Sequence, residues 1–346
     1  MDILKPELVW ISGRCYRVNA EHNTDATGPD VLEENDFCGM GDEDINNDCE
    51  AEYAIETLAN GNFRSSFHVP QFYYAQIIGA RGAVRRKIEL ETQTKISIPR
   101  KGQRGDVVIT GNSEKNVFKA RRRIDLIVIA SRNKQPFTHF LSIPFNSAEI
   151  KDRFQEFKAR ILENPLIFVD PKSFQIPEKL HLTIGTMCLM DNEDRALAAE
   201  LLNECRKSVI DPILEKLGPI KLTLSGLEIM NDDPSTVDVL YGCIQETQWS
   251  NDGTFQNLLD KIVDFFSRKG LIQKQYDHVK LHVTLLNSLF SQDSEEMARK
   301  PFNASIILNT FGSYEFGSQE LQEIHLSQRY STGCDGYYQS TMILQC

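Results

Sequence analysis

The chain has 346 residues, of which 41% are hydrophobic and 25% are charged, and a formal net charge of −11. That length is enough for two or three domains with cores of their own, and the composition is that of an ordinary globular protein. No apolar run approaches a membrane span, the first residues lack the pattern of a signal peptide, and the eight cysteines form no Cys-x-x-Cys pair. We therefore expect an intracellular protein with reduced thiols and no membrane partner.

Charge is distributed unevenly along the chain. Residues 1–62 contain 15 acidic and 3 basic side chains, residues 63–135 contain 5 acidic and 16 basic ones, and residues 136–346 are acidic again. A basic segment inside an acidic protein predicts a polyanionic partner for that segment. The charge shifts, and a proline at position 136 that ends a predicted helix, divide the chain into domains at 1–62, 63–135 and 136–346.

The first segment combines a predicted hairpin with a strongly acidic stretch. Residues 8–17 predict two short strands around a turn at Ser12-Gly13. Residues 25–56 contain twelve acidic residues and neither lysine nor arginine, so we expect them to be largely disordered. Three roles are open for this stretch: a solubilising tail, an electrostatic mimic that competes with nucleic acid for the basic segment, or a docking peptide.

The basic middle segment predicts the order strand, helix, helix, strand, strand, helix. These elements are expected at 63–69, 70–78, 83–92, 95–99, 106–110 and 113–131. The loop Gly79-Ala80-Arg81-Gly82 joins the first two helices. Its glycines let the backbone approach a sugar-phosphate chain, and the helix N-terminus beyond the loop favours anions. Arg81, Arg85 and Arg86 are the candidates for phosphate contacts.

This succession around a Gly-x-x-Gly loop resembles a eukaryotic-type KH domain (βααββα). The resemblance implies that the loop clamps single-stranded RNA or single-stranded DNA, with the bases on an apolar groove. Ile77, Ile78 and Ile96 either line such a groove or belong to the core. The alternative for the loop is a glycine turn between two packed helices, and the arginines at 121–123 are either a further contact or a solvated helix face.

The last segment contains a six-residue string that occurs twice. Lys179-Leu180-His181-Leu182-Thr183-Ile184 returns almost letter for letter as Lys280-Leu281-His282-Val283-Thr284-Leu285. Both copies alternate in polarity with period two, which predicts strands whose His and Thr side chains project together. An amphipathic helix is expected before each copy, at 147–162 and 254–270, so the order of elements repeats as well and indicates two lobes related by a pseudo-twofold axis.

Further elements are expected on either side of these repeats. The strands are predicted at 140–145, 220–230, 236–244, 321–328 and 337–345, and the remaining helices at 193–217 and 303–311. The fold class expected for the whole chain is therefore α+β, with a KH domain followed by a bilobal domain.

The duplicated His-x-Thr arrangement resembles the 2H phosphoesterase superfamily, which includes RNA ligase-like cyclic phosphodiesterases and the nucleotide-binding domain of a kinase-anchoring protein. The resemblance covers 136–346 and implies that His181 and His282 are catalytic, while Thr183 and Thr284 bind phosphate. One neutral imidazole would take a proton from water or a ribose 2′-hydroxyl, and the other, protonated, would give one to the leaving oxygen. The threonines would donate hydrogen bonds to the non-bridging oxygens, and neither a metal nor another cofactor is required.

The order of the two modules resembles a family of transcription cointegrator subunits. That resemblance implies a nuclear location, a helicase and other subunits of the cointegrator complex as partners, and a part in transcription coactivation and alkylation-damage repair. Two functions stay open: a metal-independent phosphodiesterase that acts on single-stranded RNA or an RNA end, and a scaffold that binds RNA or nucleotide without turnover. His325, which has no partner copy, is expected to be structural or peripheral.

Overall fold

The computed structural model describes residues 8–11, 14–17, 53–100, 102–246, 255–292 and 299–346. The chain forms two compact units, 1–52 and 53–346. In the first unit, β1 (Leu8–Ile11) and β2 (Arg14–Arg17) pair in antiparallel fashion, which confirms the two predicted hairpin strands. The predicted turn and most of the acidic stretch lie outside the described residues.

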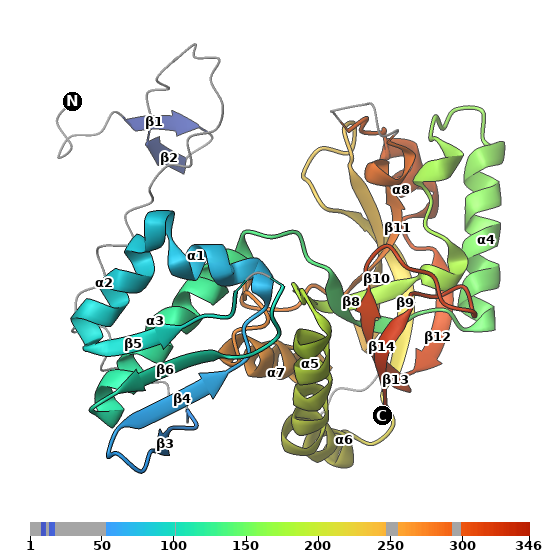
Figure 1. The fold of residues 1–346 in the computed structure, drawn as a ribbon. Helices are drawn as coiled ribbons and strands as arrows, with labels where there is room; N and C mark the ends of the chain where they lie inside the picture. The colour runs from blue at the N-terminus through green and yellow to red at the C-terminus, as the bar shows by residue number, and fades with distance from the viewer. Residues whose placement is uncertain (1–7, 12–13, 18–52, 101, 247–254, 293–298) are drawn as a thin grey trace. The chain divides into compact units, whose positions relative to one another are not determined.

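The basic middle segment folds into the KH domain that its pattern predicts (Figure 1). Its strands form one antiparallel sheet in the order β3-β4-β6-β5, and are β3 (Glu56–Thr57), β4 (Phe63–Phe67), β5 (Thr94–Ser97) and β6 (Val107–Gly111). Its helices are α1 (Tyr74–Ile78), α2 (Ala83–Thr92) and α3 (Glu114–Asn133). Apolar residues of the sheet and all three helices form one core, in which Ile77, Ile109 and Ile124 are fully buried.

The last segment is built on an eight-stranded antiparallel sheet in the order β12-β9-β10-β11-β8-β7-β13-β14 (Figure 1). The strands are β7 (His139–Pro144), β8 (His181–Met187), β9 (Lys221–Ile229), β10 (Val239–Glu246), β11 (His282–Asn287), β12 (Glu315–Glu320), β13 (Glu323–Gln328) and β14 (Ser340–Gln345). The order is symmetric about the β8–β11 seam, because each lobe places its motif strand innermost. The predicted pair of repeated lobes is thereby confirmed.

Five α-helices accompany this sheet among the described residues. They are α4 (Ala148–Glu163), α5 (Asn192–Cys205), α6 (Asp211–Leu217), α7 (Phe255–Arg268) and α8 (Ser305–Phe311). The helix expected at 193–217 is α5 and α6 joined by a π-helical turn, Arg206–Ile210. Among these helices and those of the KH domain, none within the described residues has the length and apolar character that crossing a membrane requires.

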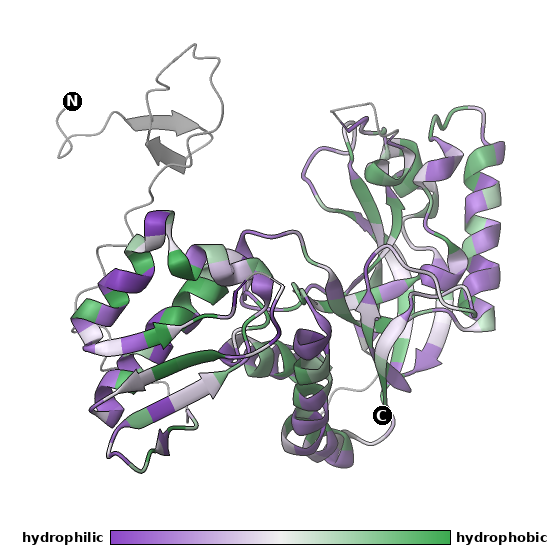
Figure 2. Ribbon diagram, viewed as in Figure 1, coloured by the Kyte–Doolittle hydropathy of each residue, from purple (hydrophilic) through white to green (hydrophobic). Residues whose placement is uncertain are grey.

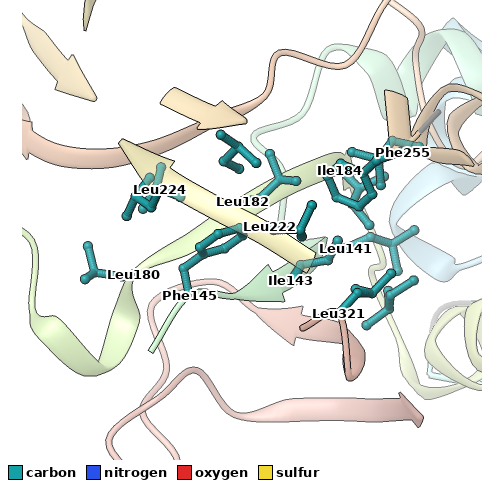
Figure 3. Packing of buried hydrophobic residues seen from close by; sticks show 14 of the residues in the cluster. Leu141, Ile143, Phe145, Leu180, Leu182, Ile184, Leu222, Leu224, Phe255 and Leu321 are labelled. Atoms are coloured by element: carbon teal, nitrogen blue, oxygen red, sulfur yellow. The ribbon is translucent and has the colours of Figure 1, made fainter. Parts of the chain in front are cut away.

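The helices cover the sheet with apolar stripes. Helix α4 begins after Ser147, whose Oγ accepts a hydrogen bond from the Ile150 amide, and it buries the side chains Ile150, Phe154, Phe157 and Ile161. Figure 2 shows hydrophilic residues alternating with apolar ones along this helix. Buried side chains of several strands, including Leu182 of β8 and Leu222 and Leu224 of β9, belong to a single core (Figure 3).

Residues of the KH domain contact the last segment through several polar side chains. The guanidinium of Arg132, near the end of α3, lies 3.1 Å from Asp194 Oδ1 and donates to the Gly270 carbonyl at 3.2 Å. The Arg132 and Asp194 side chains are only 10% and 4% exposed. Since α3 ends at Asn133 and β7 begins at His139, the connection between them is short; the boundary at 135/136 stays a prediction.

We predict that Asp194→Ala lowers the free energy of unfolding by about 3–5 kcal/mol, because it leaves the Arg132 charge buried without its carboxylate. Urea unfolding of the full chain measures this change. The matched control is Glu204→Ala, which breaks the exposed pair with Lys269 and should cost about 0–1 kcal/mol. Equal losses for the two variants would contradict a buried ion pair at Arg132.

Candidate functional site

The two motif strands meet at the centre of the large sheet. Leu182 of β8 and Val283 of β11 are register partners, and both side chains are fully buried in the core. Because side chains alternate along a strand, the residues on either side of each one point to the opposite face. In antiparallel register His181 lies across from Thr284, and His282 lies across from Thr183. The structure therefore brings together the four residues that the sequence motif singles out, and each is partly exposed.

The spacing of these positions suits a tetrahedral group between the rings. Directly opposed residues in such a pair have Cβ atoms about 4.5–5.5 Å apart, and diagonal residues are about 7–8 Å apart. His181 and His282 are diagonal neighbours in this register, and each threonine lies directly across from the histidine of the other strand. Protonation of His282 would lower the pKa of His181 further, because the two charges would repel each other.

Both imidazoles are oriented by a backbone carbonyl two residues earlier in the chain. His181 Nδ1 lies 2.7 Å from the Lys179 oxygen, and His282 Nδ1 lies 2.9 Å from the Lys280 oxygen. A carbonyl oxygen can only accept, so Nδ1 carries the hydrogen in both rings. In each histidine Nε2 is consequently the nitrogen that can gain or lose a proton. The arrangement is the same in both copies and does not by itself select the acid and the base.

Burial makes both histidines poor proton acceptors in the free protein. It lowers the pKa of His181 to about 4, with the charge of His282 as a smaller cause, against the effect of the Lys179 carbonyl. Burial also lowers the pKa of His282, and the Lys280 ammonium contributes to that shift. Both rings are therefore neutral at pH 7. A bound anion would raise both pKa values, because negative charge stabilises an imidazolium.

Aromatic rings that no sequence motif indicates pack against both histidines. The ring centroids of Phe140 and Tyr338 each lie 5.2 Å from that of His181. In the other lobe, the Tyr241 ring lies 5.5 Å from that of His282. These rings help to bury the two imidazoles.

The lysine of each motif lies over the same aromatic ring that packs against its histidine. Lys179 Nζ is 4.9 Å from the centroid of Tyr338, and Lys280 Nζ is 4.5 Å from that of Tyr241. The strands β8 and β11 begin only at the histidines, so the lysines are not part of the strands. Each lobe nevertheless repeats one trio of lysine, aromatic ring and histidine, which adds positive charge near the paired motifs.

The Gly-x-x-Gly loop of the KH domain has the backbone geometry that requires glycine. Gly79 and Gly82 have φ angles of 69° and 79°, and the exposed Arg81 between them has a φ of 51°. A Cβ atom on Gly79 would lie 2.4 Å from Val84 Cγ2, so a larger residue cannot fit without displacing α2. Ala80 and Arg81 are the exposed residues of the loop.

The predicted phosphate-binding arginines have different surroundings. Arg86, which is exposed, donates to the Arg81 carbonyl at 2.6 Å and to the Gly82 carbonyl at 3.2 Å, so its side chain braces the loop. Arg85 lies 3.9 Å from Glu89 in an i,i+4 pair. Arg81 and Arg86 are exposed, and Arg85 is half-buried. Contacts of these arginines with a nucleic acid stay a prediction.

Other residues that the sequence singles out as possible binding residues are buried or are paired with neighbouring side chains. Ile77 and Ile96 are 0% and 3% exposed and belong to the KH core rather than to an open groove. Arg121 stacks on the Phe67 ring and pairs with Asp125 at 3.1 Å. His325 is 4% exposed, and its two ring nitrogens lie 2.7 Å from Glu323 Oε2 and 2.9 Å from Ser340 Oγ. These contacts suit the structural role expected for His325.

One group of potential metal ligands occurs among the described residues, away from the paired motifs. Ligand atoms of His68, Asp191 and Glu193 lie within 4.8 Å of one another, and His68 and Glu193 are exposed. His68 Nε2 is 2.9 Å from Asp191 Oδ2, so a hydrogen bond between the KH domain and the last segment accounts for the position of these two residues.

Comparisons with known proteins match both folded segments. A family model described as KH domain matches residues 64–126, and one described as AKAP7 2'5' RNA ligase-like domain matches 137–345. The mouse protein "Activating signal cointegrator 1 complex subunit 1" is 36% identical over 365 residues and covers 98% of both chains. The KH and 2H resemblances inferred from the motifs are thereby confirmed.

Solved structures with similar folds exist for each segment. The first KH type I domain of human vigilin is 25% identical and covers 28% of this chain and 94% of that chain, with a TM-score of 0.21. Escherichia coli LigT in apo form is 15% identical and covers 61% of this chain and 98% of that chain, with a TM-score of 0.33.

We predict that His181 and His282 both exist as the Nδ1–H tautomer at pH 7, because their Nδ1 atoms face carbonyl oxygens. Nitrogen-15 chemical shifts of the imidazoles measure this directly. His325 is an internal reference for the other tautomer, because its Nε2 faces a carboxylate and should carry the hydrogen. An Nε2–H tautomer at either motif histidine would contradict the orientation described above.

Proposed function

The chain belongs to the AKAP7 2'5' RNA ligase-like family, with a KH domain preceding that module, and from this premise we propose that it is an RNA-binding phosphodiesterase. Single-stranded RNA or an RNA end is the proposed substrate, and catalysis needs no metal. The observation that carries the proposal is the register of Leu182 with Val283, which gives one face of the sheet two histidines and two threonines. The KH loop would supply the affinity for the RNA chain.

The proposed reaction begins with proton uptake. Both imidazoles are neutral in the free protein, and the phosphodiester anion raises their pKa values so that one of them becomes protonated. Nε2 of the neutral ring takes a proton from water or a ribose 2′-hydroxyl while the oxygen–phosphorus bond forms. The protonated ring gives its Nε2 proton to the leaving oxygen as the bond between phosphorus and the leaving oxygen breaks. Attack by a 2′-hydroxyl leaves a 2′,3′-cyclic phosphate and a 5′-hydroxyl.

The remaining groups of the site act on the charge of the phosphate. The hydroxyls of Thr183 and Thr284 donate hydrogen bonds to the non-bridging oxygens, on which negative charge increases in the transition state. The ammonium groups of Lys179 and Lys280 add positive potential from beside the histidine-packing rings. None of these steps passes through a metal ion.

We further propose an assembly role. The mouse relative is named as a subunit of the activating signal cointegrator 1 complex. By that similarity, this chain would be a nuclear subunit that works with a helicase and other members of the complex in transcription coactivation and alkylation-damage repair.

A second candidate function is a scaffold that binds RNA or a nucleotide without turnover. The depressed histidine pKa values favour it, because the free protein then holds no protonated acid at pH 7. Long incubation separates the two functions: the scaffold binds tightly and yields no product.

We predict metal-independent cleavage of labelled single-stranded RNA by the wild-type chain in excess chelator. His181→Ala should slow this cleavage by about 100- to 10,000-fold, the range for loss of a general acid or base. The control is His278→Ala, since the His278 side chain is 75% exposed and pairs with Asp260 rather than with the motifs. Equal product from the wild type and His181→Ala would end the enzyme proposal.

We predict that replacing both Arg81 and Arg85 by alanine weakens binding of single-stranded RNA and flattens its salt dependence. Each lost phosphate contact should reduce the slope of log K against log salt by about 0.7. Fluorescence anisotropy across a salt series measures both quantities. Arg160→Ala, on the exposed side of α4, is the control. An unchanged slope would mean that the loop is not the contact surface.

A further inference from the structure

A stack of three planar groups lies where the KH domain joins the large sheet. The guanidinium of Arg329, directly after β13, lies 4.0 Å from the ring centroid of Phe137 and 4.3 Å from that of Tyr330. The Arg329 Nη1 also donates to the Phe137 carbonyl at 3.3 Å, which fixes the guanidinium against the connection between α3 and β7. We call Phe137, Arg329 and Tyr330 the Arg329 stack.

The outer member of the Arg329 stack is exposed and has an unusual backbone angle. Tyr330 is 86% exposed and has a φ angle of 58°, which L residues with large side chains rarely adopt. Strained backbone of this kind persists where the surroundings determine it, and such positions concentrate at ligand sites. The Tyr330 ring thus presents an open face at a fixed position.

A cavity of about 330 Å³ adjoins the Arg329 stack. Besides the three stacked residues it is lined by Gln135, Pro136, Thr138 and Met190. Its volume is in the range of sites that hold small molecules of the size of a nucleotide. Met190 also packs against the KH core, so the cavity lies at the junction between the two domains.

The Arg329 stack is continuous with the paired motifs. The Phe137 ring lies 6.4 Å from Phe140, and the Phe140 ring lies 5.2 Å from His181. The loop that follows Tyr330 also reaches the site, because Lys179 Nζ donates to the Ser331 carbonyl at 3.0 Å. An occupant of the stack would therefore lie close to the residues that position His181, with the buried Phe140 ring between them.

We propose that the Arg329 stack is a subsite for an unpaired base of single-stranded RNA, positioned between the KH domain and the two histidines. Aromatic rings and guanidinium planes are the groups on which proteins stack unpaired bases. The subsite deepens the function proposed above, since it would hold a strand that extends from the KH loop toward the paired motifs. It accounts for an exposed aromatic ring, an ordered arginine and a cavity that the two-histidine chemistry does not use.

The test is the affinity for a fluorescent 12-nucleotide 2′-O-methyl RNA, which cannot form a cyclic phosphate. Its binding is therefore independent of cleavage by a 2′-hydroxyl. Tyr330→Ala should weaken binding by about 10- to 100-fold, the loss expected for one stacked base. Tyr330→Phe keeps the aromatic face and should bind like the wild type. Tyr276→Ala removes another tyrosine that is 79% exposed and should also bind like the wild type.

Cross-linking locates the contact independently of affinity. In the same oligonucleotide with 4-thiouridine, we expect cross-linked peptides that contain Tyr330 or Phe137. Wild-type affinity in Tyr330→Ala, or cross-links confined to the KH domain, would overturn the subsite while leaving the two-histidine proposal intact. A reduced affinity of Tyr330→Ala for this oligonucleotide, together with no cleavage of unmodified RNA by the wild-type chain, would support the subsite and end the two-histidine enzyme proposal.

Discussion

The candidate site depends on the register between the two central strands of the large sheet. Leu182 and Val283 face each other across the seam and are fully buried in the core. A slip of one residue in either strand would turn its histidine and threonine into the core and its leucine or valine outward. The energy that holds the register is therefore the hydrophobic burial of the core, although none of the core residues takes part in chemistry. This separation allows the polar face to carry reactive groups.

The same packing sets the chemical state of the site. Aromatic rings on both sides desolvate the histidines and lower their pKa values, and the preceding carbonyls fix Nδ1 as the protonated nitrogen. The lysine of each motif lies against the aromatic ring of its own lobe. The free protein thus holds two neutral bases in a positive environment. An anionic ligand would create the acid that the free site lacks, which couples binding of a phosphate to the readiness for proton transfer.

Local pattern predicted most elements and the composition of the paired site, because polarity with period two and a duplicated hexapeptide are visible in the chain itself. Strand β12 (Glu315–Glu320) was missed, since Phe316 is its one buried residue and Gly317 interrupts the pattern. Tyr241 and Tyr338 were also missed, because a neighbouring strand and a distant loop bring them to the histidines. Arg86 is a predicted phosphate contact, but its guanidinium bonds to loop carbonyls. The positive charge is visible in the sequence, whereas the direction of the side chain is not.

A crystal structure of the chain with a nucleoside 3′-monophosphate tests the central claim most directly. The account predicts that one phosphate lies within hydrogen-bond distance of Nε2 of both His181 and His282 and accepts from the hydroxyls of Thr183 and Thr284. A phosphate that contacts one motif alone, or that binds elsewhere on the protein while both imidazoles stay without a ligand, would contradict it.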